Sequence, residues 1–241
     1  MIGAGKRVLL KGRDRTYFIQ TGHGTYSTDK GVIDLEDLSK VELGETITTH
    51  TGYEFRVDLP RPPDFFEHSR RSGAPMLPKD IGLVISYTGM NRLDRVLDAG
   101  TGTGIAAIYF GGIAHEVLSY EIRPEFAEIA RKNIREAGLD NVTVISGDVL
   151  SAEGTYDIVH YDMMIGPEHV RHAHSLLRPG GFMACYTPFI EYLMGVLDEA
   201  SLLFAEVRAI ECIEREMTRT KRGTRPSTKV GHSGYLTFAR K

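Results

Sequence analysis

The sequence predicts an α/β fold in which a Rossmann-like, mainly parallel sheet follows a small β-rich N-terminal domain. Three observations support this prediction. From Lys79 onward short apolar runs alternate with runs of helical periodicity, the first strand of that series ends in a glycine-rich turn, and the residues before it carry period-two patterns. We therefore expect a β-rich domain over residues 1–62 and the α/β domain over residues 63–241.

The N-terminal domain is expected from runs rich in β-branched and aromatic residues. The runs RVLLKG, TYFIQT, TITTHTG and YEFRVDL alternate apolar and polar side chains, and glycines separate them. This pattern is typical of a small antiparallel sheet or barrel. The proline-rich segment LPRPPD then interrupts any regular ladder of strands, so we expect a linker there.

In the α/β domain, helices and strands are expected to alternate. Helical patterns cover Lys79 to Met90, a stretch ending at Phe110, a helix beginning near Pro124, and the polar run EHVRHAHSLL. The runs RVLDAG, EVLSYEI, VTVIS, YDIVHYD and FMACY are the expected strands, with a turn at Pro179-Gly180-Gly181 before the last one. This alternation implies right-handed βαβ units and a parallel sheet.

The composition limits the classes of protein to consider. The chain has 241 residues and a formal net charge of −3, which argues against a uniformly basic nucleic-acid coat. Its two cysteines, Cys185 and Cys212, have no CxxC spacing, so neither a disulfide framework nor a zinc site is expected. Because no signal-peptide pattern or membrane-length apolar run is visible, we expect a cytoplasmic protein without a membrane or metal partner.

The most informative run is Asp98-Ala99-Gly100-Thr101-Gly102-Thr103-Gly104, which follows a strand and opens a helix. Open α/β sheets bind nucleotide-like ligands at this position. The glycines at Gly100, Gly102 and Gly104 let the backbone turn tightly and approach a ligand, because a Cβ would collide with it. Many dehydrogenases have a similar loop, so the glycines alone do not identify the cofactor.

Acidic residues at successive strand ends narrow the choice of cofactor. We expect Glu121 to bind ribose hydroxyls and Asp148 to accept a hydrogen bond from an adenine amino group. Asp98 can approach a cationic amino-acid group, and Asp162 is expected to face the reacting centre. A single such acid is most simply a solvated residue at a strand end. The order of the four acids along the chain, however, resembles the pattern of class I methyltransferases, which use S-adenosylmethionine. Further cofactor contacts are expected from Met76, Thr103, Ile105, Phe126 and Val149.

A dehydrogenase is the minor alternative for this loop. An acid after the second strand would also suit the ribose of NAD. However, Asp98 directly before the loop is unfavourable beside a pyrophosphate, and a dehydrogenase has no need of Asp162.

Longer motifs make the resemblance to methyltransferases more specific. They are His50-Thr51-Gly52, Arg70-Arg71 followed by Pro78-Lys79-Asp80, Ser119-Tyr120-Glu121-Ile122-Arg123, Leu177-Arg178-Pro179-Gly180-Gly181-Phe182 and the tail GHSGYLTFAR. On these residues the chain resembles, over nearly its whole length, the tRNA (adenine-N1)-methyltransferases that modify the T-loop adenine in archaea and bacteria. The SYEIR motif and the tail are the narrowest of these signals.

The resemblance implies an S-adenosylmethionine-dependent enzyme that binds tRNA, forms a homotetramer and methylates N1 of adenine 58, with adenine 57 as a further target. Methylation makes the adenine ring cationic, and Asp162 is the catalytic candidate because a nearby carboxylate stabilises that charge. Two positions depart from the family. The motif Asp-Leu-Pro-x-Pro is replaced by Asp162-Met163-Met164-Ile165-Gly166-Pro167, and Leu77 stands where many relatives place an aromatic residue or histidine that could stack on an extruded base.

Basic residues supply the candidates for RNA contact. The stretch 215–229 contains Glu216 as its only acid, and phosphate contacts are expected from it. The candidate RNA-binding residues are Arg70, Arg71, Leu77, Arg219, Arg222, Arg225 and His232. A solvated basic surface is the alternative for the stretch, and an orienting contact to the backbone is the alternative for His232. No carboxylate or cysteine joins His169, His172 and His174 into a metal site.

Two other functions fit the same sequence. A class I methyltransferase could act on a protein isoaspartyl carboxylate or on a small molecule, but the β-rich domain and the basic stretch favour RNA. Outside the enzymes, the chain could be a non-catalytic tRNA-binding subunit. The retained acids at strand ends argue against this, since a subunit without cofactor does not need them.

Overall fold

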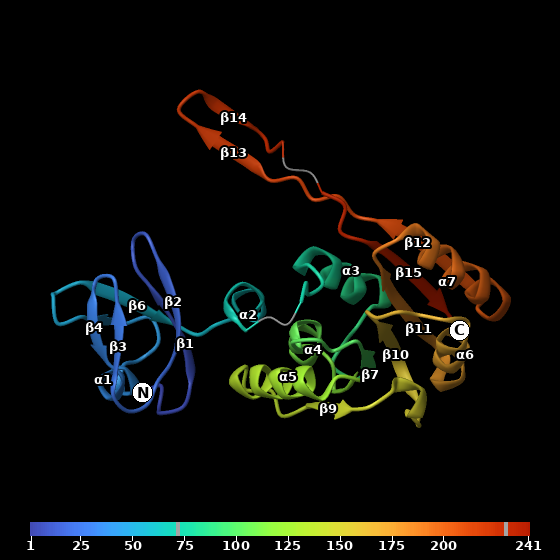
Figure 1. The fold of residues 1–241 in the computed structure, drawn as a ribbon, viewed down its shortest axis with the longest axis horizontal. Helices are drawn as coiled ribbons and strands as arrows, with labels where there is room; N and C mark the ends of the chain where they lie inside the picture. Colours follow the sequence, from blue (N-terminus) through green and yellow to red (C-terminus); the bar gives the residue numbers. More distant parts are fainter. Residues whose placement is uncertain (71–72, 229–230) are drawn as a thin grey trace. The chain divides into compact units, whose positions relative to one another are not determined.

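The structure is a computed structural model that describes residues 1–70, 73–228 and 231–241. The chain divides into two compact units, Met1–Ser69 with Arg135–Gly138, and Arg70–Ile134 with Leu139–Lys241. Figure 1 shows the elements of both in sequence colours. The expected α/β fold with additional β structure in the N-terminal part is confirmed. The sequence placed a division after residue 62, whereas the helix that begins at Pro62 is grouped with the first unit.

The first unit is built on a four-stranded antiparallel sheet in the order β2-β1-β6-β5. Its strands are β1 (Arg7–Lys11), β2 (Thr16–Gln20), β5 (Thr46–Thr48) and β6 (Glu54–Asp58). The other elements are the strands β3 (Thr25–Thr28) and β4 (Gly31–Asp34) and the helices α1 (Leu35–Lys40) and α2 (Pro62–His68). Inward-facing side chains such as Val8, Leu10, Phe55 and Val57 form its core. The strands predicted from period-two runs are therefore present.

Two helices of this unit are absent from the sequence prediction. The segment LPRPPD is not only a linker, because Pro62 and Pro63 occupy the first turn of α2, where a missing backbone N–H is tolerated. The helix α1 is short, and Asp34 caps it by accepting hydrogen bonds from the backbone N–H groups of Glu36 and Asp37.

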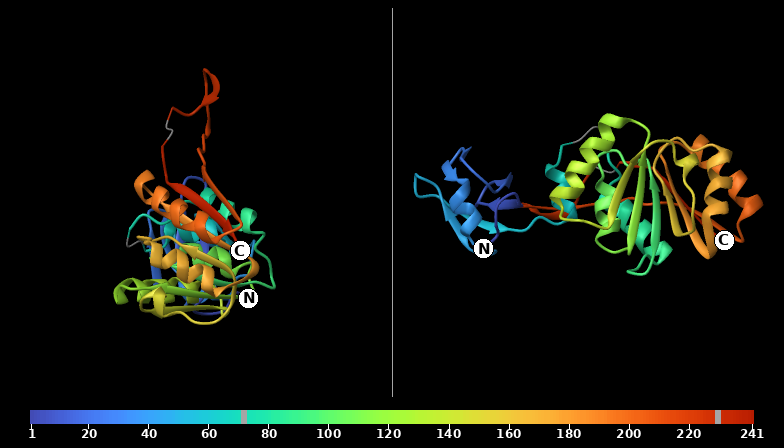
Figure 2. Two further views of the ribbon diagram at one scale, coloured as in Figure 1. Left: turned by 90° about the vertical axis from the view of Figure 1, so that its right-hand side faces the viewer. Right: turned by 90° about the horizontal axis from the view of Figure 1, so that it is seen from below.

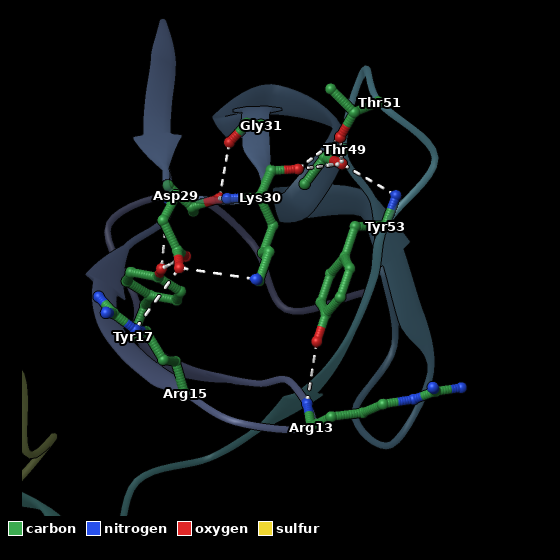
Figure 3. A network of polar contacts seen from close by, with 10 residues as sticks. Arg13, Arg15, Tyr17, Asp29, Lys30, Gly31, Thr49, Thr51 and Tyr53 are labelled. Carbon is green, nitrogen blue, oxygen red and sulfur yellow. Dashed lines mark hydrogen bonds and ion pairs between the residues drawn. The ribbon is translucent and has the colours of Figure 1, made fainter.

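His50 and Thr51 of the motif His50-Thr51-Gly52, together with the preceding Thr49, hold the turn between β3 and β4; Figure 3 shows the contacts of Thr49 and Thr51. The hydroxyls of Thr49 and Thr51 both donate to the Lys30 carbonyl, and His50 Nδ1 accepts a hydrogen bond from the Val32 backbone N–H at 2.8 Å. Gly31 has φ +117°, and a Cβ there would lie 2.7 Å from the Thr51 hydroxyl oxygen. The motif thus has a structural role within the first unit.

The second unit contains a seven-stranded sheet in the order β12-β15-β11-β10-β7-β8-β9. Its strands are β7 (Arg95–Ala99), β8 (Glu116–Glu121), β9 (Val142–Ser146), β10 (Tyr156–Tyr161), β11 (Leu177–Thr187), β12 (Glu206–Glu211) and β15 (Tyr235–Arg240). Strands β7 to β11 pair in parallel, and β15 is antiparallel to both of its neighbours. The expected turn at Pro179-Gly180-Gly181 lies inside β11, where the pairing with β10 is irregular.

Helices cover both faces of this sheet (Figure 2). They are α3 (Pro78–Thr88), α4 (Ile105–Gly111), α5 (Pro124–Glu136), α6 (Pro167–Leu176) and α7 (Ile190–Leu203), with a short 3₁₀ helix η1 (Val149–Ser151). Helices α6 and α7 pack together on one face, and α3 and α4 lie on the other. The central strands β7 and β10 are buried along most of their length, which is why their sequences are mainly apolar.

The basic stretch expected near the C-terminus is a hairpin of β13 (Met217–Thr220) and β14 (Gly223–Pro226). Within the described parts of the chain these strands pair only with each other, and every residue in them is exposed. None of the helices in the described parts of the chain is long and apolar enough to cross a membrane.

Candidate active site

Two cavities lie at the carboxyl ends of the parallel strands and share Gly100, Arg123 and Asp162. The first has a volume of about 230 Å³, and its lining includes Met76, Gly102, Thr103, Ile105 and Phe126. The second has a volume of about 460 Å³, and its lining includes Glu121, Asp148, Val149, Met163 and His169. The sheet edge therefore brings together most of the residues that the sequence assigns to the cofactor.

The glycine-rich loop after β7 passes directly over the backbone of residue 162. Gly100 has φ +84°, and a Cβ there would lie 1.9 Å from the Asp162 carbonyl oxygen. The Asp162 N–H in turn donates to the Ala99 carbonyl at 2.9 Å. Gly104 also has φ +84° and caps α4, where a Cβ would press against Ala130 of α5. Only glycine permits both the loop conformation and these close approaches.

Glu121 ends β8 and is 2% exposed. Its carboxylate accepts hydrogen bonds from the Gly102 backbone N–H at 2.8 Å and from Arg123 Nε at 2.8 Å. Burial raises the pKa of Glu121, but the hydrogen bonds from Arg123 and Gly102 together lower it below its usual value. Glu121 is therefore a stable carboxylate whose position is tied to the glycine-rich loop.

Asp148 follows β9 and is exposed at the second cavity. Its Oδ1 accepts a hydrogen bond from the Leu150 backbone N–H at 2.9 Å, which caps η1. The cap leaves the second carboxylate oxygen available to a ligand in that cavity. His169 of α6 lies on the same lining, and its Nδ1 accepts the Gly166 backbone N–H at 3.0 Å.

Asp162 follows β10 and faces both cavities. Burial raises its pKa to about 6, the carboxylates of Asp98 and Asp80 add to the rise, and His160 opposes it. Near neutral pH Asp162 is thus mainly ionised but weakly solvated. A carboxylate in this state interacts strongly with positive charge that develops next to it.

Asp98 lies behind the cavities and lines neither of them. Its Oδ1 is 2.7 Å from His160 Nδ1, its Oδ2 accepts a hydrogen bond from the Ser119 hydroxyl, and Ser119 is 2.6 Å from the Thr101 hydroxyl. All four side chains are buried. The structure therefore places Asp98 in a network beneath the glycine-rich loop, rather than at the cavity surface where the sequence expects it.

The residues expected to bind RNA lie in three places. Leu77 is the N-cap of α3, beside Met76, and is 36% exposed. Arg70 is exposed at the start of the second unit, and Arg71 lies outside the described residues. Arg219, Arg222 and Arg225 are exposed on the β13–β14 hairpin.

His232 lies at the base of this hairpin. Its Nδ1 is 2.7 Å from Glu211, and its Nε2 is 3.0 Å from the Pro188 carbonyl. The hydrogen bonds to Glu211 and Pro188 raise the pKa of His232 above its usual value. The sequence left two roles open for His232, contact with RNA and an orienting contact to the backbone. The hydrogen bonds to Glu211 and Pro188 fit the second role.

Sequence reasoning did not assign Arg123 or His169 to the site. Arg123 belongs to the SYEIR motif. Its guanidinium lies 3.9 Å from the centre of the Phe126 ring and forms an ion pair with Glu121. That motif was the available signal for Arg123. His169 could not be found from the sequence, because its place depends on how α6 begins. The described residues contain no group of three or more His, Cys, Asp or Glu side chains that could hold a metal ion.

Comparisons with known proteins agree with this geometry. A family model described as a methyltransferase domain matches residues 96–181. A solved structure described as a SAM-dependent O-methyltransferase from Thermotoga maritima has a TM-score of 0.87 and 25% identity, covering 99% of this chain and 93% of that one. The fold and its site thus define a class I, S-adenosylmethionine-dependent methyltransferase.

A tRNA (adenine(57)-N(1)/adenine(58)-N(1))-methyltransferase, TrmI, from Methanocaldococcus jannaschii is 30% identical and covers 97% of this chain and 94% of that protein. The chain belongs to the tRNA (adenine-N1)-methyltransferase family, which confirms the resemblance seen in its motifs. TrmI from Aquifex aeolicus has the same fold, with a TM-score of 0.80 at 23% identity, covering 99% of this chain and 98% of that one.

Proposed function

We propose that this chain transfers the methyl group of S-adenosylmethionine to N1 of adenine 58 in the T-loop of tRNA, with adenine 57 as a second acceptor. The observation that carries the proposal is the similarity to a relative named for both adenines, at 30% identity over 97% of the chain. That similarity extends over both compact units, so the N-terminal unit is part of what the two proteins share.

The two cavities fit this cofactor. Gly100 and Gly102 leave the loop backbone accessible, Glu121 suits the ribose hydroxyls, and Asp148 suits the adenine amino group. Apolar contacts are available from Met76, Ile105, Phe126 and Val149, and backbone contacts from Thr103 and Gly104 at the start of α4. S-adenosylmethionine supplies an activated methyl group on a sulfonium. The role of Asp98 is to hold the loop through Ser119 and Thr101.

Asp162 is the catalytic residue in this proposal. It follows β10 at the point where both cavities meet, so an extruded adenine placed there would have this carboxylate beside its N1 edge. Asp162 can accept a hydrogen bond from the exocyclic amine and stabilises the positive charge that the ring gains on methylation. Extrusion of the base costs a few kcal/mol of unstacking, which contacts to the surrounding RNA must offset.

Contacts to the rest of the tRNA are assigned to basic residues. Arg219, Arg222 and Arg225 on the exposed hairpin, together with Arg70 and Arg71, suit phosphate groups. Leu77 offers the extruded base an apolar surface without ring stacking. His232 orients the base of the hairpin through Glu211 and Pro188.

We propose further that the protein works in the cytoplasm as a homotetramer. Exposed apolar side chains at the start of α7 support self-association, among them Phe189 at 60% and Met194 at 51% exposure. Analytical ultracentrifugation tests the tetramer, since a monomer at micromolar concentration would contradict it.

The proposed reaction is tested with labelled S-adenosylmethionine and an unmodified tRNA transcript. After digestion, N1-methyladenosine should appear, and a transcript with guanine at positions 57 and 58 should take up no label. The variant Asp162→Asn serves as the control for contaminating activity. Cofactor binding without any label in the wild-type transcript would direct the search to another acceptor, such as a protein isoaspartyl carboxylate or a small molecule. Absence of cofactor binding would support a non-catalytic subunit instead.

A further inference from the structure

One ammonium group joins the first turn of α3 to both stems of the basic hairpin, which are residues 212–216 between β12 and β13 and residues 231–234 before β15. Lys79 Nζ donates to Asp80 Oδ1, to the Cys212 carbonyl and to Ser233 Oγ, each at 2.7 Å. Cys212 follows β12 on the way to the hairpin, and Ser233 precedes β15 on the return. All three donors of this ammonium are therefore used, and its side chain is only 11% exposed.

The return segment is held from its other side by Tyr186 of β11. The Tyr186 hydroxyl donates to the Ser233 carbonyl. At the next residue, Gly234, a Cβ would lie 2.4 Å from the Tyr186 ring, so the backbone packs directly on that ring. Lys79 and Tyr186 thus fix the position of Ser233, from which the returning chain enters β15.

The same lysine is connected to the proposed active site. Met76, which lines the first cavity, and Leu77, the N-cap of α3, come directly before the turn that carries Lys79. Asp80 is fully buried, and its Oδ2 has no hydrogen-bond partner among the described residues. Among the described residues, Lys79 is the ion-pair partner of Asp80, a carboxylate that raises the pKa of both Asp162 and Tyr186.

We propose that Lys79 is a positioning residue that couples the basic hairpin to the acceptor site, by fixing both hairpin stems to the turn that presents Met76 and Leu77. The inference rests on the proposed function, because it takes the hairpin as a tRNA-binding element. Among the described residues the hairpin strands pair only with each other, so their direction depends on how the two stems are held. A tRNA bound on the hairpin can then present its T-loop to Asp162 in one orientation.

Hydrogen exchange tests the connection without any assay of activity. In Lys79→Met, the amides at the adjoining ends of β12 and β15, residues 209–211 and 235–237, should exchange about tenfold faster than in the wild type, as the loss of a charge-assisted hydrogen bond implies. Lys132→Met, an exposed lysine on α5, is the matched control and should leave these amides unchanged. Unchanged exchange in Lys79→Met would overturn the proposal. The double variant Lys79→Met/Asp80→Asn should give the same fast exchange, because it removes the stem contacts without leaving a buried carboxylate unpaired.

The coupling between Lys79 and tRNA binding on the hairpin is tested by asking whether the effects of two changes on KM for tRNA add up. Lys79→Met/Asp80→Asn should raise KM for tRNA about tenfold and leave the Kd for S-adenosylmethionine within about twofold. Replacing residues 217–226 by a short glycine-serine turn should also raise KM, and the combined variant should be no worse than this replacement alone. Fully additive effects, or a loss of cofactor binding, would overturn the coupling. If the wild-type protein neither binds nor methylates tRNA, the proposed function fails and the coupling with it, whereas the exchange result still decides whether Lys79 holds the stems.

Discussion

Asp98 and His160 face each other across the neighbouring strands β7 and β10, with Asp98 Oδ1 2.7 Å from His160 Nδ1 in the buried interior. Ser119 on the other neighbouring strand, β8, donates to the second oxygen of the same carboxylate. One side chain thus links three adjacent strands directly below the glycine-rich loop. The pair also lies close to the reacting centre, since Asp162 follows His160 by two residues.

We expect Asp98→Asn to lower the stability of the fold more than it lowers cofactor binding or turnover. The amide can accept only one of the two hydrogen bonds, so either His160 or Ser119 faces a mismatched group inside the sheet. The free energy of unfolding should fall by about 2–3 kcal/mol, measured by urea denaturation with and without S-adenosylmethionine. A variant as stable as the wild type but unable to bind cofactor would instead place Asp98 in direct contact with the ligand.

The comparison of Asp98 with Glu121 illustrates what the sequence could predict. Parallel strands end at one edge of the sheet, so the strand pattern alone placed Asp98, Glu121, Asp148 and Asp162 near one another. Whether each side chain faces the ligand or the interior depends on partners that are distant in sequence. Asp98 is turned inward by His160, 62 residues away, and no local pattern records that pairing.

The same limit explains the missed features of the site. Lys79 was visible only as part of a motif, because its partners Cys212 and Ser233 are brought to it by β12 and β15. The basic stretch was predicted to carry positive charge, but no strands were predicted in it. Its strands are exposed throughout, so the sequence has no alternation between buried and exposed positions that would reveal them. The five parallel strands β7 to β11 were predicted from their apolar runs, whereas the antiparallel strand β15 and the edge strand β12 of the same sheet were not predicted.

Glu121→Gln should weaken cofactor binding without loss of the fold. A glutamine keeps one acceptor oxygen but loses the charge that Arg123 and the Gly102 N–H now stabilise. The Kd for S-adenosylmethionine, measured by calorimetry, should rise about 10- to 100-fold, as expected for hydrogen bonds to a charged acceptor. Glu125→Gln in the first turn of α5 is the matched control. Equal affinities of the two variants would exclude Glu121 from the ribose site.

The pH dependence of turnover should reflect Asp162. Because burial raises its pKa to about 6, the free enzyme loses the carboxylate as the pH falls through that value. We expect kcat/KM for tRNA to fall about tenfold per pH unit below 6 and to level off above 7. Asp162→Asn should abolish this acid limb and reduce kcat by roughly 10²–10³. A profile in which the variant keeps the wild-type limb would assign the titration to another group.

Asp162→Asn, which should lower turnover, should at the same time raise the free energy of unfolding at alkaline pH. A carboxyl whose pKa is higher in the folded state than in the unfolded chain destabilises the folded state above the unfolded pKa. Asp162→Asn should therefore be more stable than the wild type at pH 8 and should lose this advantage as the pH falls towards 4. Urea denaturation at several pH values measures this difference. A variant less stable than the wild type at pH 8 would mean that the ionised form is favourably bound in the folded protein.

Phosphate contacts on the hairpin should be visible in the salt dependence of tRNA binding. The triple variant Arg219→Ala/Arg222→Ala/Arg225→Ala removes three exposed cations from β13, β14 and their turn. If each neutralises one phosphate, the slope of log Kd against log salt should decrease by about 2–3. The exposed residues Arg92 and Lys132, changed to alanine, form the control. An unchanged slope in the triple variant would leave the hairpin as a solvated surface.

Leu77→Tyr should improve the use of tRNA by this protein. Leu77 is partly exposed beside the first cavity and offers an extruded adenine no ring on which to stack. Stacking on an aromatic side chain contributes about 1–3 kcal/mol per base, so even a partly formed contact should raise kcat/KM for tRNA by about fivefold. Leu77→Ala should lower it, because the apolar contact is lost as well. The Kd for S-adenosylmethionine, unchanged in both variants, separates an effect on the base from damage to the neighbouring Met76. If tyrosine and alanine behave alike, residue 77 does not contact the flipped base, and another side chain must hold it against Asp162.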